Sequence, residues 1–304
     1  MSELITFIGV GNMGNPMAHN LVKAGKKVKV FDVSKNMIEK AKEKKMDVVE
    51  NLDDLITNEV TTVITMLPEG KNSKEVYLGD KGMINKVSNN CLLIDCSTID
   101  IQTSIEIGKK ATEKGIKMID APVSGGVMGA EKATLNIMVG GTKEAFDLAL
   151  PLLKIMGKNI FHAGDLGSGN GAKICNNMSL GITMIAASES LMLAKRLNID
   201  IKKVHEIMKN ASGNSWPISV YPPLPGLIEG TPSNNNYRAG FSAGMMNKDL
   251  KLANECAKQV NASTPLAKMA LEIYDKFCEE GNDTKDFSAI SKVIGGDAWN
   301  YPID

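Results

Sequence analysis

The chain has 304 residues, of which 43% are apolar and 5% aromatic, and its 35 basic and 35 acidic side chains balance. This length can bury a large core and usually divides into about two domains. The balanced charge argues against a nucleic-acid or anionic-membrane partner, and no apolar run is long enough for a membrane span. We therefore expect a soluble globular protein with a small-molecule ligand.

The five cysteines are scattered, odd in number and never spaced as a C-x-x-C pair. This argues against a disulfide framework and a structural zinc site, and predicts a reducing compartment. His19, His162 and His205 are isolated, so no metal site is expected. The first strand is predicted within the first few residues, so we expect no signal peptide and a cytoplasmic protein. A processed eukaryotic chain would look identical and would belong in the mitochondrial matrix.

Short apolar runs alternate with helical stretches in the first half, a pattern typical of βαβ units around a parallel sheet. The helical periodicity is clear over Asn36–Lys45, where the apolar residues share one face. We expect strands near Leu4–Ile8, Val28–Asp32, Val60–Met66, Cys91–Asp95, Lys117–Asp120 and Asn136–Val139. Residues 1–163 are therefore predicted to form an α/β Rossmann domain.

After about His162 the pattern is helical to the end, apart from a Pro/Gly/Asn-rich segment at Trp216–Gly240. We expect that segment to be a long ordered loop with a functional or interfacial role. The first helix is predicted to start near Gly167–Gly171 and to run without a proline to about Leu197. Residues 164–304 are thus predicted to form a second, all-α domain, and this first helix is long enough to span both domains.

Gly9-Val10-Gly11-Asn12-Met13-Gly14 follows the first strand and opens a helix, the context in which a G-x-G-x-x-G pattern indicates a dinucleotide site. Gly9 permits a tight turn, Gly11 lets the backbone approach a pyrophosphate, and Gly14 allows close packing of helix on strand. The free N–H groups at the helix start favour phosphate. Taken alone, the pattern fits a simple glycine-rich turn equally well.

Asp32 ends the second strand about 20 residues downstream, where a carboxylate can accept hydrogen bonds from the adenosine ribose hydroxyls. It would repel a 2′-phosphate, and no arginine is nearby, although Lys35 is close, so NAD is favoured over NADP. The alternative for Asp32 is a turn residue at a strand end. Ligands of open α/β sheets bind at the carboxyl ends of strands, so Met66–Asn72 and Asp95–Thr98 should also line the site.

The run Asp120–Gly126 combines the hydroxyl of Ser124 with two glycines, Gly125 and Gly126, whose backbone N–H groups are exposed. Such a turn can form an anion nest, for which a substrate carboxylate is the natural occupant. The alternative is an ordinary strand-to-helix turn.

Lys173 and Asn177 lie four residues apart at the start of the long predicted helix, hence on one face, where both could contact one ligand. Desolvation would lower the pKa of such a lysine toward neutrality, which suits proton exchange with an alcohol that becomes a carbonyl. Asn177 could hold the substrate oxygen or carboxylate. By its chemistry alone Lys173 could equally be a solvated lysine. Cys175 points away from the shared face and is interpreted as structural.

Four segments resemble, in order, the signature motifs of the β-hydroxyacid dehydrogenases, a family related to 6-phosphogluconate dehydrogenase. They are Gly9–Met17, Asp120–Gly126, Gly171–Asn177 and Asn247–Leu250, and the match spans essentially the whole chain. Within that family, four further segments resemble the 3-hydroxyisobutyrate dehydrogenase branch: Ser212–Trp216, Pro223–Gly226, Pro232–Tyr237 and Lys285–Ser288.

The resemblance implies that the helical domain builds a homodimer or homotetramer, with a cleft between the two domains. It implies NAD-dependent oxidation of 3-hydroxyisobutyrate to methylmalonate semialdehyde, a step of valine catabolism, with Lys173 as catalytic acid/base. It also implies that Ser124, Gly125 and Asn177 hold the substrate. The residues expected on the cofactor side are Leu67, Pro68, Asn72, Thr98 and Lys248, with Phe241 near the nicotinamide. The alternatives are a reductase of tartronate semialdehyde or another small β-hydroxyacid, and a catalytically silent NAD-binding module of the same fold.

Overall fold

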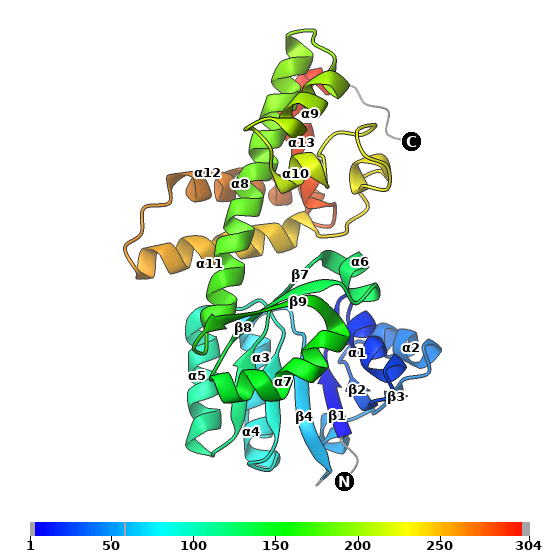
Figure 1. Ribbon diagram of the computed structural model, residues 1–304, viewed down its shortest axis with the longest axis vertical. Helices are drawn as coiled ribbons and strands as arrows, with labels where there is room; N and C mark the ends of the chain where they lie inside the picture. The colour runs from blue at the N-terminus through cyan, green and yellow to red at the C-terminus, as the bar shows by residue number, and fades with distance from the viewer. Residues whose placement is uncertain (1–3, 58, 300–304) are drawn as a thin grey trace. The chain divides into compact units, whose positions relative to one another are not determined.

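The computed structural model describes residues 4–57 and 59–299, which form two compact units, Met1–Lys173 and Ile174–Asp304. The first unit is an α/β sheet domain and the second is helical, as Figure 1 shows for each. The predicted fold class is therefore confirmed.

The six expected strands are all present, each within two residues of its predicted limits at either end. They are β1 (Leu4–Ile8), β2 (Lys27–Phe31), β4 (Val60–Thr65), β5 (Leu92–Asp95), β6 (Lys117–Asp120) and β8 (Leu135–Gly140). Three strands were not predicted: β3 (Asp47–Val48), β7 (Val123–Ser124) and β9 (Gly157–Gly164). Two of these are only two residues long, and β9 is largely exposed, so none carries a buried apolar run.

The sheet has the strand order β3-β2-β1-β4-β5-β6-β8-β7, with β9 paired to β8. Strands β1 to β6 pair in parallel, whereas β8 runs antiparallel to β6 and β7. The chain builds outward from β1 on one side through β2 and on the other side through β4. This reversal is the topological switch point at which open α/β sheets bind ligands, beyond the carboxyl ends of the strands.

Helices cover both faces of this sheet, and each face has its own apolar core. Alternate residues of β1 point to opposite faces, with Ile5 and Phe7 in one core and Leu4 and Ile8 in the other. One core includes α1 (Gly14–Lys23), α2 (Lys35–Glu43) and α7 (Lys143–Met156). The other includes η1 (Leu52–Leu55), α3 (Gly70–Leu78), α4 (Met83–Lys86) and α5 (Ile101–Glu113). Burial on both faces explains why the strands are continuous apolar runs in the sequence.

The second unit begins within α8 (Ser168–Arg196), the long helix predicted from the sequence. Its other helices are α9 (Ile201–Asn210), α10 (Trp216–Ser219), α11 (Ala243–Gln259), α12 (Pro265–Phe277) and α13 (Ser291–Gly295). Short helical turns are η2 (Pro232–Asn234), η3 (Cys278–Asn282), η4 (Phe287–Ile290) and η5 (Gly296–Ala298). The predicted loop Trp216–Gly240 therefore holds α10 and η2, joined by irregular chain.

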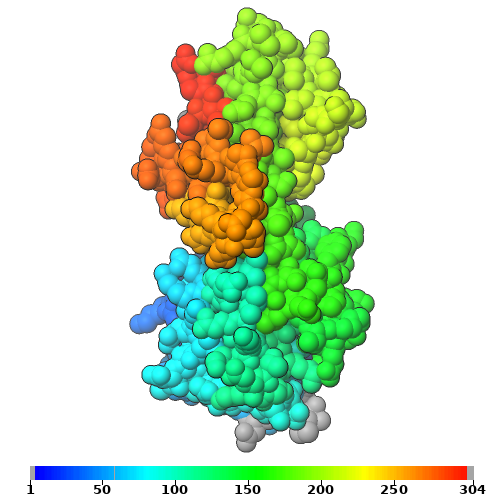
Figure 2. Space-filling view, turned by 90° about the vertical axis from the view of Figure 1, so that its left-hand side faces the viewer, coloured from blue at the N-terminus to red at the C-terminus, as the bar shows by residue number. Residues whose placement is uncertain are grey.

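Apolar side chains are exposed on the second unit around α12. The atoms of this segment are orange in Figure 2. Leu266 and Met269 on α12 and Val260 just after α11 are each more than half exposed. Apolar surface of this kind is typical of protein–protein interfaces. It is compatible with the expected oligomer, which stays a prediction. No helix in the described part of the chain is long and apolar enough to cross a membrane.

Candidate active site

The glycine-rich loop joins β1 to α1, and two of its glycines cannot be replaced without moving the backbone. Gly9 has a φ of +90°, and a Cβ there would lie 2.3 Å from the carbonyl oxygen of Met66. A Cβ on Gly14 would lie 1.9 Å from the carbonyl oxygen of Gly9. The loop therefore turns tightly and seats the start of α1 against the strand, which is the geometry expected for a dinucleotide site.

Three further features of this loop fit a pyrophosphate. A Cβ on Gly11 would meet no atom within 4 Å, so a ligand can approach the backbone at that residue. Asn12 is exposed and Met13 is half-buried at the start of α1, which has no side-chain hydrogen bond from its N-cap. Asn15 is buried, and neither its amide nitrogen nor its amide oxygen has a hydrogen-bond partner among the described residues. The Asn15 N–H donates to the carbonyl oxygen of Gly11 at 3.0 Å, so an anion at this helix start would bind the N–H groups that precede it.

Asp32 follows β2 and is half-buried beside the loop. One carboxylate oxygen accepts the N–H of Val10 at 2.8 Å, and the other accepts the N–H of Ser34 at 2.8 Å. Each oxygen keeps further capacity to accept a ribose hydroxyl. The turn-residue interpretation and the ribose interpretation are therefore compatible, because the same carboxylate that could hold a ribose also fixes the loop.

The loops after β4 and β5 are joined through Asp95, which is fully buried. Its Oδ1 accepts the hydroxyl of Thr65 at 2.9 Å and the N–H of Ser97 at 2.9 Å, and the Ser97 hydroxyl in turn accepts the N–H of Leu67 at 2.8 Å. Burial raises the pKa of Asp95, and the hydrogen bonds from Ser97 and Thr65 oppose that rise.

Sequence reasoning placed both loops at the site but did not identify Asp95 as the link between them. The expected cofactor residues lie on these loops or directly after them. Leu67 is half-buried, Pro68 is exposed, Asn72 lies in the first turn of α3, and Thr98 is half-buried. All of them therefore follow the carboxyl ends of β4 and β5, the edge at which such sheets bind ligands.

The Asp120–Gly126 segment turns sharply between β7 and α6 (Gly126–Glu131). Gly125 has a φ of +136° and Gly126 a φ of +62°, a region that favours glycine. Ser124 is half-buried and Gly125 is exposed, so the turn is accessible. A short helix, α6, follows this turn.

Lys173 and Asn177 are both buried on α8, with exposed fractions of 6% and 1%. The alternative that Lys173 is a solvated surface lysine is therefore wrong. Cys175, between them, is exposed, so it does point away from their face.

In the second unit, Asn177 contacts α11. Its amide nitrogen donates to Oδ2 of the buried Asp249 at 2.5 Å, and the Lys248 ammonium lies 3.4 Å from Oδ1 of the same carboxylate. Sequence reasoning named Asn177 and Lys248 but missed Asp249, although it lies within the Asn247–Leu250 segment. Asp249 therefore orients two of the expected site residues.

Phe241 is held in place by Asp286. The N–H of Phe241 donates to Oδ2 of this buried carboxylate at 3.2 Å, and the hydroxyl of Tyr221 donates to the same oxygen at 2.8 Å. The Phe241 ring packs edge-on against Phe287, with ring centroids 5.6 Å apart. Burial raises the pKa of Asp286, and the hydrogen bonds from Ser288, Phe241 and Tyr221 oppose that rise. The expected site residues up to Lys173 thus belong to the first unit, and Asn177, Phe241 and Lys248 belong to the second.

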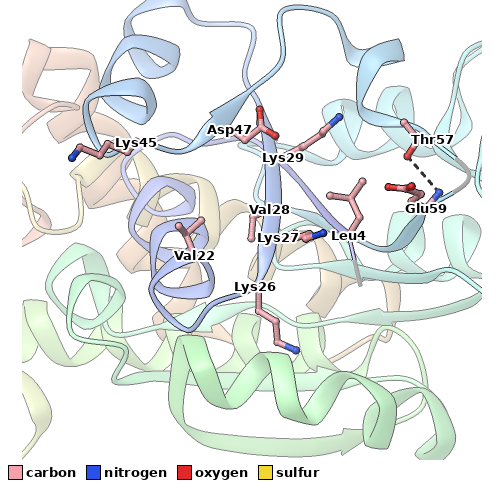
Figure 3. A pocket seen from close by; sticks show the side chains of 10 residues that line it. All are labelled: Leu4, Val22, Lys26, Lys27, Val28, Lys29, Lys45, Asp47, Thr57 and Glu59. Carbon is pink, nitrogen blue, oxygen red and sulfur yellow. Dashed lines mark hydrogen bonds between the residues drawn. The ribbon is translucent and has the colours of Figure 1, made fainter. Parts of the chain in front are cut away.

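A cavity of about 720 Å³ lies at the amino ends of β1 and β2, the opposite edge of the sheet from the glycine loop (Figure 3). Several lysines line it, but the side chains of Lys26, Lys29 and Lys45 point in different directions. We assign no ligand to it. Within residues 4–57 and 59–299, no group of three or more His, Cys, Asp or Glu side chains could hold a metal ion.

Two family models match the chain. The NAD-binding domain of 6-phosphogluconate dehydrogenase matches residues 4–164, and the NAD-binding domain of NADP-dependent 3-hydroxyisobutyrate dehydrogenase matches residues 167–294. The 3-hydroxyisobutyrate dehydrogenase of Pseudomonas aeruginosa is 43% identical, covering 96% of this chain and 98% of the relative. The mitochondrial enzyme of Rattus norvegicus is 42% identical, covering 95% and 86%.

Two further proteins that are similar to this chain have L-serine in their descriptions. The NAD-dependent L-serine dehydrogenase of Pseudomonas aeruginosa is 40% identical over 95% of this chain and 97% of its own. The solved structure of Mycobacterium tuberculosis 3-hydroxyisobutyrate dehydrogenase with L-serine superposes with a TM-score of 0.91 at 37% identity, covering 97% and 100%. These matches identify an NAD(P)-dependent oxidoreductase that acts on CH–OH groups of small hydroxyacids. The chain belongs to the 3-hydroxyisobutyrate dehydrogenase family of β-hydroxyacid dehydrogenases.

Proposed function

We propose that the chain catalyses the reversible NAD-dependent oxidation of 3-hydroxyisobutyrate to methylmalonate semialdehyde, as in valine catabolism, with Lys173 as general acid/base. The observation that carries the proposal is the burial of Lys173 together with Asn177 on one face of α8. A lysine amine held beside the substrate can accept a hydroxyl proton in its neutral form and return it as the ammonium. Relatives of more than 40% identity carry this activity in their names.

In the oxidation, the neutral amine of Lys173 accepts the proton of the substrate hydroxyl while the hydrogen on the same carbon departs as hydride and a carbonyl forms. Bound NAD supplies the hydride acceptor. In the reverse direction the Lys173 ammonium returns the proton to the oxygen. The N–H groups of Ser124, Gly125 and Gly126 and the amide of Asn177 would hold the substrate carboxylate and oxygen, which keeps the hydroxyl within reach of Lys173.

The dinucleotide would be held first by the loop from β1. Gly9, Gly11 and Gly14, with Asn12 and Met13, would cradle the pyrophosphate, and Asp32 would accept the ribose hydroxyls. Because that carboxylate would repel a 2′-phosphate, we propose NAD rather than NADP. Residues assigned to the remaining cofactor contacts are Leu67, Pro68, Asn72, Thr98, Phe241 and Lys248.

A second candidate substrate is L-serine, which carries an ammonium group where 3-hydroxyisobutyrate carries a methyl group. It is favoured by the 40% identity to an L-serine dehydrogenase and by the solved relative with L-serine. The reaction at the hydroxyl carbon would be the same in both substrates. The ammonium needs hydrogen-bond acceptors or negative charge, whereas the methyl needs apolar contact, so a comparison of the two substrates distinguishes the candidates.

The test is a steady-state panel with NAD and with NADP, using 3-hydroxyisobutyrate and L-serine in oxidation and tartronate semialdehyde in reduction. We expect the highest kcat/KM with 3-hydroxyisobutyrate and NAD. A higher value with L-serine would establish the second candidate.

In the same assay, Lys173→Ala should lower kcat by about 10² to 10⁴, while NADH affinity measured by fluorescence stays close to that of the unmodified protein. Lys195→Ala is the matched control, since Lys195 is a half-buried lysine on the same helix, and burial lowers its pKa. Its turnover should be unchanged. Undiminished turnover in Lys173→Ala would rule out the assigned role.

A further inference from the structure

The start of α8 is held by a carboxylate from the sheet. Asp120, the last residue of β6, is fully buried. Its Oδ1 accepts the N–H of Gly167 at 2.7 Å, and its Oδ2 accepts the N–H of Asn170 at 2.7 Å. The first N–H groups of a helix have no partner within the helix, and a negative charge there is favoured by the helix dipole. Both oxygens of Asp120 are therefore committed to the first turn of α8.

The side chain of Asn170 fastens the same turn to two other segments. It is fully buried, its amide oxygen accepts the N–H of Ile99 at 3.0 Å, and its amide nitrogen donates to the Ser104 hydroxyl at 3.0 Å. Ile99 follows Thr98 in the loop after β5, and Ser104 lies in α5. Asn170 thus ties α8 to the loop that carries a proposed cofactor residue.

Glycines bring the helix start into direct contact with the sheet. A Cβ on Gly169 would lie 2.5 Å from the carbonyl oxygen of Met138 and 2.8 Å from Asp120. A Cβ on Gly140 would lie 2.3 Å from Oδ1 of Asp120 and 2.7 Å from the nitrogen of Gly169. The first turn of α8 consequently has no room to shift toward the strands.

The source of the cap is unusual within this chain. The helices α5, α7 and α11 are capped by the residue directly before them, Asp100, Thr142 and Ser242 respectively. Asp120 instead lies 47 and 50 residues from the groups it caps. A local cap stabilises a helix wherever the helix lies, whereas a cap from β6 also fixes where α8 starts on the sheet.

Lys173 lies three residues beyond Asn170, about 4.5 Å along the helix axis. Because an α-helical turn is stiff, the hydrogen bonds that fix Gly167 and Asn170 also fix the backbone of Lys173. Asp120 also opens the segment that carries Ser124. We propose that Asp120 and Asn170 are positioning residues that hold Lys173 in register with the Thr98 and Ser124 loops. This inference rests on the proposed role of Lys173.

The test uses Asn170→Ala, which removes the contacts to Ile99 and Ser104 while keeping the backbone N–H that Asp120 accepts. We expect kcat to fall about 10- to 100-fold, because small misplacement of a catalytic group has effects of that size. NADH affinity should fall less than kcat, because the glycine loop is untouched and only the Thr98 loop loses a tether. Ser104→Ala loses one of the two contacts and should lower kcat less, and it serves if Asn170→Ala does not fold.

Thr6→Val is the matched control, because its buried hydroxyl donates to the carbonyl of Leu55 at 3.1 Å, away from α8. It should keep its kcat. An unchanged kcat in folded Asn170→Ala, or a loss of NADH affinity as large as the loss of kcat, would overturn the inference. Asp120→Asn should lower kcat in the same way, since an amide offers only one oxygen to the two N–H groups.

Hydrogen exchange separates this inference from the proposed function. The amides of residues 167–173 should exchange faster in Asn170→Ala than in Thr6→Val, whatever the substrate. If the unmodified protein oxidised no hydroxyacid of the panel, the proposed function would fail, and faster exchange would still support the positioning of this turn. Equal exchange in the two variants would overturn the positioning even in an active enzyme.

Discussion

Gly11→Ala and Gly14→Ala add the same methyl group three residues apart and should have opposite effects. At Gly14 the methyl would lie 1.9 Å from the carbonyl oxygen of Gly9, so α1 must move away by roughly 1.5 Å to restore ordinary contact. Overpacking of this kind costs about 1–3 kcal/mol, and the higher helix propensity of alanine recovers up to about 1 kcal/mol. We expect Gly14→Ala to lower the free energy of unfolding by about 1–2 kcal/mol.

At Gly11 the methyl would meet no protein atom within 4 Å, and φ is not positive. Alanine there should leave stability unchanged or raise it by about 0.4–1 kcal/mol, because the unfolded chain loses freedom. Since the methyl would occupy space proposed for the pyrophosphate, NADH affinity should fall more than about tenfold, or about 1.4 kcal/mol.

The assay pairs urea unfolding, followed by circular dichroism, with a fluorescence titration of NADH on each variant. Tight NADH binding by Gly11→Ala would show that the pyrophosphate does not lie against this loop. A larger loss of stability in Gly11→Ala than in Gly14→Ala would refute the steric reasoning.

Two further predictions concern buried or half-buried carboxylates. Asp32→Ala should raise the KM for NAD about tenfold and that for NADP much less, because it removes the ribose acceptor along with the acceptor of the Val10 N–H; a preference of the unmodified protein for NADP would contradict the cofactor assignment. Asp95→Asn keeps Oδ1 as acceptor for Thr65 and Ser97 but removes the titrating carboxyl, whose pKa is raised by burial. When the pKa of a carboxyl is higher in the folded than in the unfolded chain, the carboxyl stabilises the fold most at a pH below its unfolded pKa. This stabilisation is lost as the pH rises through the folded pKa. The Tm of the unmodified protein should therefore rise relative to that of Asp95→Asn as the pH falls from 8 to 4.5. A Tm difference between the two proteins that stays constant over this range would contradict the raised pKa of Asp95.

The main strands were predictable because the sheet is covered on both faces. Each central strand then becomes an apolar run, as in Leu4–Ile8. The glycine spacing after this strand was also informative, because a side chain at Gly9 or Gly14 would clash with the backbone of the β1–α1 turn. The long helix α8 was predictable for a similar reason, since no proline interrupts its sequence.

The missed elements leave no pattern in the sequence. Strand β9 is mostly exposed, so it lacks the apolar alternation of a core strand, and β7 exists only through pairing with β8. The polar residues that organise the candidate site were missed for a different reason. Asp95, Asp120 and Asp249 act through partners 30 to 72 residues away, and only the folded chain brings these groups together.

The two hydrogen bonds accepted by Asp120 also determine how the protein can be divided for separate study. The first family model ends at residue 164, but the donors Gly167 and Asn170 lie beyond it. A fragment that stopped there would leave the Asp120 carboxylate without either N–H group, and in the whole chain burial raises the pKa of that carboxyl. An isolated nucleotide-binding fragment therefore needs the opening turn of α8 to supply the hydrogen bonds of Asp120. A fragment for separate study should extend past Asn170.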